Sequence, residues 1–210
     1  MASMMNIYPA KVTEYIQHLR SENVQLLPPD INESYTGFSV VCSKELDGRP
    51  VKKIRYGLSS IKNVGAALVD RLVQERESNG SFRSMTDFCR RMQDLDLNKR
   101  AMENMIKAGA FDTLGGARSQ YLQAYPLIMN ASAQWKKTLM SGQIDLFDLG
   151  AEPGAERGNE LAADPLPVVE EFPEMLRLTF EKEVLGLYLT GHPLQADETL
   201  WRATITNPAT

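Results

Sequence analysis

The sequence predicts a mainly α-helical protein that opens with a small α/β segment containing a β-hairpin and closes with an acidic linker and a C-terminal helix. Three observations indicate this fold class. Two runs typical of strands flank one tight turn before residue 57, apolar residues recur at helical spacing from Ser59 onward, and a stretch rich in Pro, Gly and Glu follows residue 142. With 210 residues, of which 43% are hydrophobic, the chain can bury a core.

The N-terminal segment is expected to hold one helix, a short strand and a hairpin. Apolar residues at helical spacing predict a helix over residues 10–21. The two prolines of NVQLLPPDINES end this helix and indicate a short strand followed by a turn. Further on, GFSVVCS and KKIRYGL have the composition of strands and flank the turn KELDGRP, which predicts a β-hairpin.

Helical spacing continues through most of the remaining chain. Ser84, ahead of Thr86 and Asp87, is a residue type that caps a helix by accepting hydrogen bonds from free amides. Pro126 marks a point where the longest helix can break. The expected helices are Gly65–Glu77, Ser84–Met92, Lys99–Ala108, Ala117–Gln143 and Phe172–Leu187.

The composition argues against several classes of protein. No run approaches the roughly 18 consecutive apolar residues of a membrane span, and MASMMNIYPAKV lacks the basic and apolar blocks of a secretory signal. The widely spaced Cys42 and Cys89, like His18 and His192, suggest neither a disulfide framework nor a metal site. We therefore expect a cytoplasmic protein in a reducing compartment that binds no metal, cofactor or membrane.

The charge is distributed unevenly along the chain. Between residues 49 and 107 there are 13 Lys and Arg against 7 Asp and Glu, whereas between residues 142 and 200 there are 3 against 13. A basic half followed by an acidic half suggests two different partners. The basic half is a candidate for phosphate contacts, although a scattered excess of this kind is more often a solvated face.

The segment GLSSIKNVGAALVDRLVQER resembles the helix-hairpin-helix motif, in which a Gly-hydrophobic-Gly turn joins a short helix to a second helix. The turn here is Lys62-Asn63-Val64-Gly65. Free main-chain amides at the start of the second helix, with the positive end of the helix dipole, bind a phosphate oxygen without reading a base. We expect Val64 to point into the core and Lys62 to add a cation.

Asn63 occupies the position of the first glycine of the motif, and asparagine is the non-glycine residue best able to adopt the left-handed conformation. A second copy is predicted in NKRAMENMIKAGAFDTLGGARSQYLQAY, where Gly115 and Gly116 lead into a helix beginning near Ala117, with Arg118 at its mouth. One such turn is more often a well-packed helix corner. Two within a basic segment favour a tandem helix-hairpin-helix domain.

Several longer stretches resemble one known family. The runs LLPPDINES, IRYGLSSIKNVG, SFRSMTDFCRRM, LNKRAMENMIKAGAFDTLG and EKEVLGLYLTGHPL are similar, in this order, to bacterial DNA polymerase III alpha subunits, the C-family replicative polymerases. The resemblance runs from about residue 11 to residue 194. It implies four parts: the end of the fingers (1–56), a tandem helix-hairpin-helix DNA-binding domain (57–141), a clamp-binding motif with an acidic linker (142–171), and a helix leading towards an OB-fold domain (172–210).

The same resemblance implies a non-catalytic fragment of a larger enzyme. The palm domain of the family, with its catalytic aspartates and the Mg that they bind, has no counterpart in the sequence. The parent protein therefore resembles a DNA-directed DNA polymerase, whereas this chain is expected to need no cofactor.

The stretch SGQIDLFDLG contains a candidate binding motif for another protein. Within it, Gln143-Ile144-Asp145-Leu146-Phe147 resembles the pentapeptide by which bacterial replication proteins bind the sliding clamp. Leu146 and Phe147 would fill an apolar pocket on the clamp, Gln143 would bond at a second subsite, and Ile144 and Asp145 would align the backbone. The alternative is that Leu146 and Phe147 pack against this chain's own core.

We expect sequence-independent contacts with duplex DNA, contacts with the sliding clamp (the beta subunit), and contacts with other replicase subunits. Two alternatives remain: a purely structural connector domain, and a helix-hairpin-helix DNA repair protein, which as a nuclease would need clustered metal-binding carboxylates. The expected DNA contacts are Lys62, Asn63, Val64, Gly65, Lys99, Arg100, Gly115, Gly116 and Arg118, with Arg55 as a further candidate.

Overall fold

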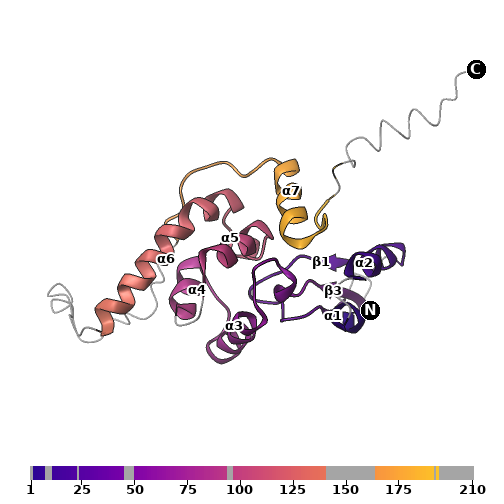
Figure 1. The fold of residues 1–210 in the computed structure, drawn as a ribbon, viewed down its shortest axis with the longest axis horizontal. Coiled ribbons are helices and arrows are strands. Elements are labelled where there is room, and N and C mark those ends of the chain that lie inside the picture. Colours follow the sequence, from indigo (N-terminus) through magenta and orange to yellow (C-terminus); the bar gives the residue numbers. More distant parts are fainter. Residues whose placement is uncertain are drawn as a thin grey trace, which may run out of the picture.

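The structure is a computed structural model, and it describes residues 2–7, 11–22, 24–44, 50–93, 97–140, 164–191 and 193. The strands and first two helices lie at one end, and the long α6 extends at the other (Figure 1). Helices predominate in the described residues, and the only strands among them form one small sheet, so the predicted fold class is confirmed.

The N-terminal segment contains α1 (Ala2–Ile7), α2 (Val12–Ser21), β1 (Leu26–Leu27), β2 (Ser39–Lys44) and β3 (Pro50–Arg55). The strand order is β1-β3-β2, with β1 parallel and β2 antiparallel to β3. The predicted hairpin, short strand and first helix are therefore confirmed, whereas α1 was not predicted. The α1 side chain of Asn6 bonds to both main-chain groups of Phe38, which attaches this helix beside the start of β2.

The helical part follows the predicted spacing closely. A short 3₁₀ helix, η2 (Leu58–Ser60), precedes α3 (Ala66–Asn79), and α4 (Met85–Met92) follows. Next come α5 (Lys99–Lys107), the 3₁₀ helix η3 (Asp112–Leu114), α6 (Arg118–Met140) and α7 (Glu174–Leu185). The helix α6 continues through Pro126 without a break, so the possible interruption is not found.

The start of α4 confirms the predicted cap. The Ser84 hydroxyl accepts a hydrogen bond of 3.0 Å from the Asp87 amide. The Asp87 carboxylate accepts a bond of the same length from the Arg83 amide. The first bond satisfies an amide that a helix start otherwise leaves unpaired, and the second fixes the residue that precedes the cap.

One continuous core runs from α1 to the residues after α7. In its helical part a row of rings connects successive elements: Phe82 meets Phe88 with centroids 5.0 Å apart, and Phe88 meets Phe111 at 5.2 Å. Tyr121 of α6 follows Phe111 at 6.1 Å. Edge-to-face rings add specific geometry to the burial of apolar area.

The turn after β1 fastens distant parts of the chain. The Ile31 amide donates to the Ala110 carbonyl at 3.0 Å, and the buried Arg76 of α3 donates to the Ile31 carbonyl at 2.9 Å. Asn32 makes two hydrogen bonds to the main chain of Phe82. Because Arg76 lies in α3 and Ala110 lies between α5 and α6, this turn connects α3 to the segment between those two later helices.

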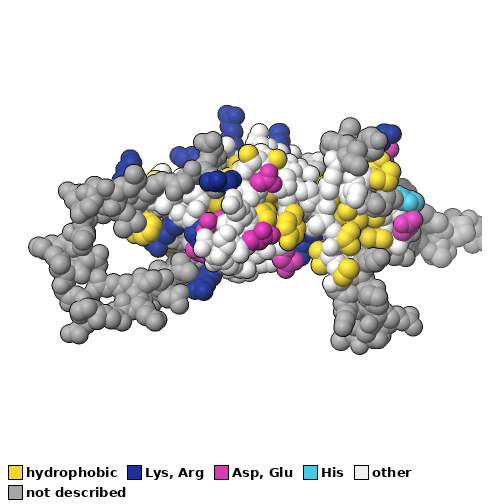
Figure 2. Space-filling model, turned by 90° about the horizontal axis from the view of Figure 1, so that it is seen from below, with side chains coloured by type: hydrophobic (Ala, Val, Ile, Leu, Met, Phe, Trp, Pro, Cys, Tyr) yellow, Lys and Arg dark blue, Asp and Glu magenta, His cyan; other side chains and the backbone are white. Residues whose placement is uncertain are grey.

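The two ends of the molecule differ in surface character. On the face seen in Figure 2, hydrophobic side chains gather over the end that carries the strands and first helices. Most of the Lys and Arg side chains on that face lie over the helical part.

Candidate nucleic-acid interface

The first corner, residues 61–65, joins η2 to α3 in the geometry that the motif requires. Asn63 has a φ of 63°, so it adopts the left-handed conformation expected for the first glycine position. Val64 is buried, as predicted, while the side chains of Lys62 and Asn63 are exposed. The corner therefore presents polar groups outward and is fastened inward by one apolar side chain.

Main-chain bonds to two later helices hold this corner in place. The Lys62 amide donates to the Val184 carbonyl of α7 at 3.0 Å. The Asn104 side-chain amide of α5 donates to the Lys62 carbonyl at 2.6 Å. Both main-chain groups of Lys62 are therefore occupied within the protein, and its side chain is left to solvent.

The start of α3 is open. In the part of the chain that the structure describes, the amides of Gly65, Ala66, Ala67 and Leu68 have no hydrogen-bond partner. A side-chain carbon placed on Gly65 would meet no atom within 4 Å, so its surroundings are empty. Unpaired amides, the positive end of the helix dipole and a nearby lysine form a site that can bind an oxyanion.

The second corner, residues 115–117 ahead of α6, is closed, which corrects the expectation of free amides there. The Gly116 amide donates to the Tyr121 hydroxyl at 3.1 Å, and the Ala117 amide donates to the Gln120 side chain at 2.9 Å. The next two amides, of Arg118 and Ser119, donate to the carboxylate of Glu171 at 2.8 and 3.2 Å. Gly115 adopts the left-handed conformation, with a φ of 90°.

The prediction that Arg118 faces DNA is wrong, because its side chain is only 3% exposed. The guanidinium pairs with Asp112 at 2.8 Å and with the fully buried Glu181 of α7 at 3.3 Å, and it donates to the Lys107 carbonyl at 3.1 Å. Burial opposes the charge, but the bonds and charges of the two carboxylates outweigh it and raise the pKa of Arg118. Arg118 joins the second corner to α7.

The basic excess of the sequence is partly internal. Arg55 is not a surface contact, because it pairs with Glu33 and donates to the Pro28 carbonyl. Bonds to other groups of the protein also occupy Arg76, Arg91 and Lys107. Among the described residues, exposed cations without a recorded partner include Lys62, Lys99 and Arg100. Part of the positive charge thus stabilises the fold, and the rest is free for a ligand.

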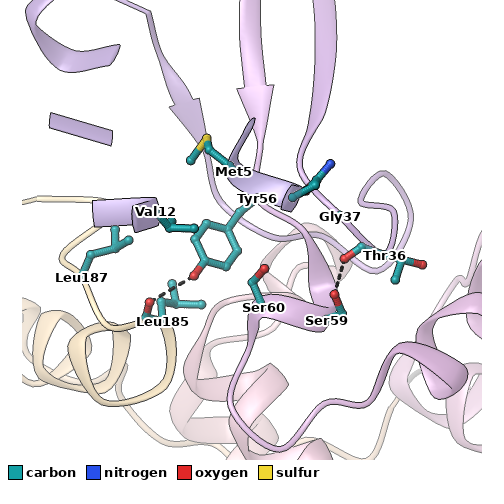
Figure 3. Close-up of a pocket in the computed structure, with 10 residues that line it drawn as sticks. Met5, Val12, Thr36, Gly37, Tyr56, Ser59, Ser60, Leu185 and Leu187 are labelled. Carbon is teal, nitrogen blue, oxygen red and sulfur yellow. Dashed lines mark hydrogen bonds between the residues drawn. The ribbon is translucent and has the colours of Figure 1, made fainter. Parts of the chain in front are cut away.

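A cavity of about 610 Å³ lies beside the first corner, between the N-terminal helices, η2 and the end of α7 (Figure 3). On its wall the Tyr56 hydroxyl donates to the Leu185 carbonyl at 3.0 Å, and Ser59 donates to the Thr36 carbonyl at 2.6 Å. Burial raises the pKa of Tyr56 to about 12, so this hydroxyl remains a donor at neutral pH. These two bonds attach the residues just before the first corner to the end of α7 and to Thr36.

The clamp-binding candidates Gln143, Ile144, Asp145, Leu146 and Phe147 lie outside the described residues. Within the described residues, no helix is long and apolar enough to cross a membrane. Neither do His, Cys, Asp and Glu side chains of that part gather in groups of three or more that could hold a metal ion.

Sequence reasoning missed Gly109, Asp164, Glu171 and Glu181. Gly109 has a φ of 82°, and the Arg118 guanidinium lies directly on it. The GAF sequence after α5 was a signal for this position, since glycine commonly ends a helix in the left-handed conformation. The three acidic residues gave no comparable signal, because nothing local distinguishes them from the other carboxylates of the acidic half.

The corner geometry defines a class of protein, and the comparisons agree with it. Residues 23–121 match the family model described as helix-hairpin-helix motif. The chain is also similar to curated DNA polymerase III alpha subunits. It is 36% identical to that of Saccharopolyspora erythraea over 190 residues, which is 90% of this chain and 15% of the relative. It is 36% identical to that of Thermus aquaticus over 186 residues, 88% of this chain and 13% of the relative.

The chain thus contains a helix-hairpin-helix motif. More particularly, it corresponds to a segment of the bacterial DNA polymerase III alpha subunits, and it spans about 15% of the length of the curated relatives it matches.

Proposed function

We propose that this chain binds duplex DNA by the phosphate backbone, without sequence specificity, through the first corner. The observation that carries this proposal is the row of amides from Gly65 to Leu68, which have no partner among the described residues and lie beside the exposed Lys62. Both groups bind phosphate oxygens, which are the same at every base pair. The helix-hairpin-helix match and the polymerase relatives support the choice of DNA as the ligand.

Binding that depends on phosphate contacts must weaken as salt rises, because each contact releases condensed counterions. We expect the chain to bind a labelled duplex at 50 mM salt and to lose affinity steeply by 200 mM. The duplex sequence should not matter. Equal affinity at both salt concentrations, or binding at neither, contradicts the proposal.

A proline substitution isolates the role of the amides. Ala66 is the first residue of α3, where proline fits the helix and removes only an amide that has no partner in the described chain. Ala66→Pro should therefore leave the melting temperature nearly unchanged. It should weaken DNA binding about tenfold or more, since hydrogen bonds to charged groups contribute about 1.5–3 kcal/mol.

A pair of lysine substitutions tests the side-chain cation. Lys62→Ala should weaken binding to all duplexes alike and reduce the salt slope by about one. The matched control is Lys137→Ala, which removes an exposed lysine from the last turn of α6. Equal losses for the two variants would mean that general charge, and not the first corner, holds the DNA.

We also propose that residues 143–147 tether the polymerase to the sliding clamp. The sequence supports this proposal: a Leu-Phe pair in the order of the clamp-binding pentapeptide falls between α6 and the acidic stretch. Replacing Leu146 and Phe147 together by Ala should abolish capture by an immobilised bacterial clamp. Leu149→Ala, which removes an apolar side chain just outside the pentapeptide, should leave capture unchanged. Capture that survives the double substitution would locate the contact elsewhere.

The closed second corner favours one alternative, a connector domain whose hairpins only hold the polymerase together. In that case the chain has no measurable affinity for duplex DNA at low salt, and Ala66→Pro has no effect on any binding. The same titrations therefore distinguish the two functions.

A further inference from the structure

The ten residues 164–173, DPLPVVEEFP, form an extended segment that leads into α7, and we name it the acidic strap. It places carboxylates on the starts of two helices. Asp164 accepts hydrogen bonds of 2.7 Å from the amides of both Met85 and Thr86 in the first turn of α4. Glu171 accepts the Arg118 and Ser119 amides at the start of α6.

Glu171 occupies the position that a phosphate takes at a helix start. Its two oxygens accept main-chain amides along the positive end of the α6 dipole, as oxygens of a bound anion do. Burial disfavours its charge, but the amides of Arg118, Phe172 and Ser119 outweigh burial and lower the pKa of Glu171. The start of α6 therefore stabilises an anion, and in this structure the protein itself supplies it.

The strap covers the second corner by more than this carboxylate. The Ser119 hydroxyl donates to the Glu170 carbonyl at 2.7 Å, and the Gln120 side chain donates to the Pro167 carbonyl at 2.8 Å. A side-chain carbon on Gly116 would lie 2.8 Å from Leu166, which shows how closely the strap crosses the turn. A DNA strand cannot reach these amides while the strap is in place.

The strap is nevertheless held mainly by hydrogen bonds, because none of its residues is fully buried. It contains no helix or strand, Val168 is fully exposed, and Pro165, Glu170 and Glu171 are exposed as residues. Segments with little buried apolar area and solvent-exposed hydrogen bonds open at low free-energy cost. The first corner offers the contrast, since no acidic group covers its amides in the described chain.

We propose that the acidic strap is an autoinhibitory contact that competes with a DNA phosphate for the start of α6. The inference rests on the proposed function, because the competing ligand is the same duplex backbone. With the strap in place the protein binds DNA by the first corner alone. When a phosphate replaces the Glu171 carboxylate, the second corner joins the contact.

Neighbouring glutamates allow a matched test in the full chain. Glu171→Ala removes the competing carboxylate, while Glu170→Ala removes an equal charge whose carboxylate has no recorded bond in the described residues. Glu171→Ala should bind a 20-base-pair duplex at least about fivefold more tightly than Glu170→Ala, the lower end of common coupling between sites. Its salt slope should be steeper by about one. Equal affinities of the two variants overturn the inference.

Hydrogen exchange on the unaltered chain gives an independent readout. The Phe172 amide donates to Glu171 at 2.7 Å, so it should exchange faster when duplex DNA displaces the strap. Slower or unchanged exchange overturns the inference. If circular dichroism shows that Glu171→Ala does not fold, the duplex affinities of Glu171→Gln and Glu170→Gln are compared instead. Glu171→Gln should then bind more tightly. If the unaltered chain binds no DNA at all, the proposed function fails; if it binds and the glutamate variants are equal, only the strap inference fails.

Discussion

The substitution Arg118→Ala tests whether this residue belongs to the fold or to the DNA contact. The change removes a guanidinium that is 3% exposed and leaves Glu181, which is fully buried, without its cation. Removing one partner of a buried ion pair costs about 3–5 kcal/mol, because the remaining charge stays desolvated. The bond to Asp112 adds little, since that carboxylate is 44% exposed.

The expected loss is large enough to measure by thermal melting. For a chain of this size, 1 kcal/mol shifts the melting temperature by about 2–4 °C, so the Arg118→Ala variant should melt about 6–20 °C lower. Circular dichroism at 222 nm, with urea unfolding at 25 °C as a second measure, reports both quantities. The salt dependence of DNA binding should not change, because the buried guanidinium cannot contact a phosphate of bound DNA.

A double substitution checks the stated cause. In an Arg118→Ala background, Glu181→Gln replaces the unpaired charge by a neutral group that still accepts bonds from the amides of Leu189 and Thr190. We expect the added Glu181→Gln substitution to recover at least about 1 kcal/mol of the lost unfolding free energy, a typical coupling between contacting residues. A loss below about 1 kcal/mol for Arg118→Ala, or no recovery in the double variant, refutes the reasoning that Arg118 is part of the fold.

Three further predictions concern stability and reactivity. Gly109→Ala should destabilise the chain more than Gly186→Ala, because both glycines have a φ near 80° but only Gly109 is covered by another side chain; urea midpoints compare them. Folding lowers the pKa of Glu171, so the stability that its carboxylate contributes is present above the ordinary pKa of 4.5 and is lost as the pH falls through the lowered pKa. Glu171→Gln should therefore flatten the acid side of a plot of melting temperature against pH. In native protein, a thiol reagent should label the exposed Cys42 but not the buried Cys89, whose pKa burial raises to about 12, and unfolding in guanidinium should make both reactive.

Local signals in the sequence predicted most of the elements. The spacing of apolar residues located α3 to α7 within a few residues, and Ser84 marked the start of α4 through its capping hydroxyl. Asn63 could be recognised as a left-handed position from its residue type alone. Each of these features is decided within one or two turns of chain, where residue type and spacing contain the needed information.

The parts that could not be predicted depend on residues distant in the sequence. Arg118 and Glu181 are 63 positions apart, and only the packing of α7 against the second corner brings them together. Glu171 lies 53 positions from the amide that it accepts. A basic residue beside a glycine turn has the same local sequence whether it faces a phosphate or a carboxylate of its own chain, so composition alone could not separate the two.

The attachment of Lys62 to Val184 has a consequence for how the protein is made. The first corner is complete only when its amide meets a carbonyl 122 residues later, and the Tyr56 hydroxyl likewise requires Leu185. A ribosome synthesises this stretch at about 5–20 residues per second, so the hydrogen bond between Lys62 and Val184 cannot form for roughly 6–25 seconds after Lys62 is added. Under the proposed function, a nascent chain therefore cannot bind DNA tightly by this corner before α7 emerges, which separates synthesis from binding in time.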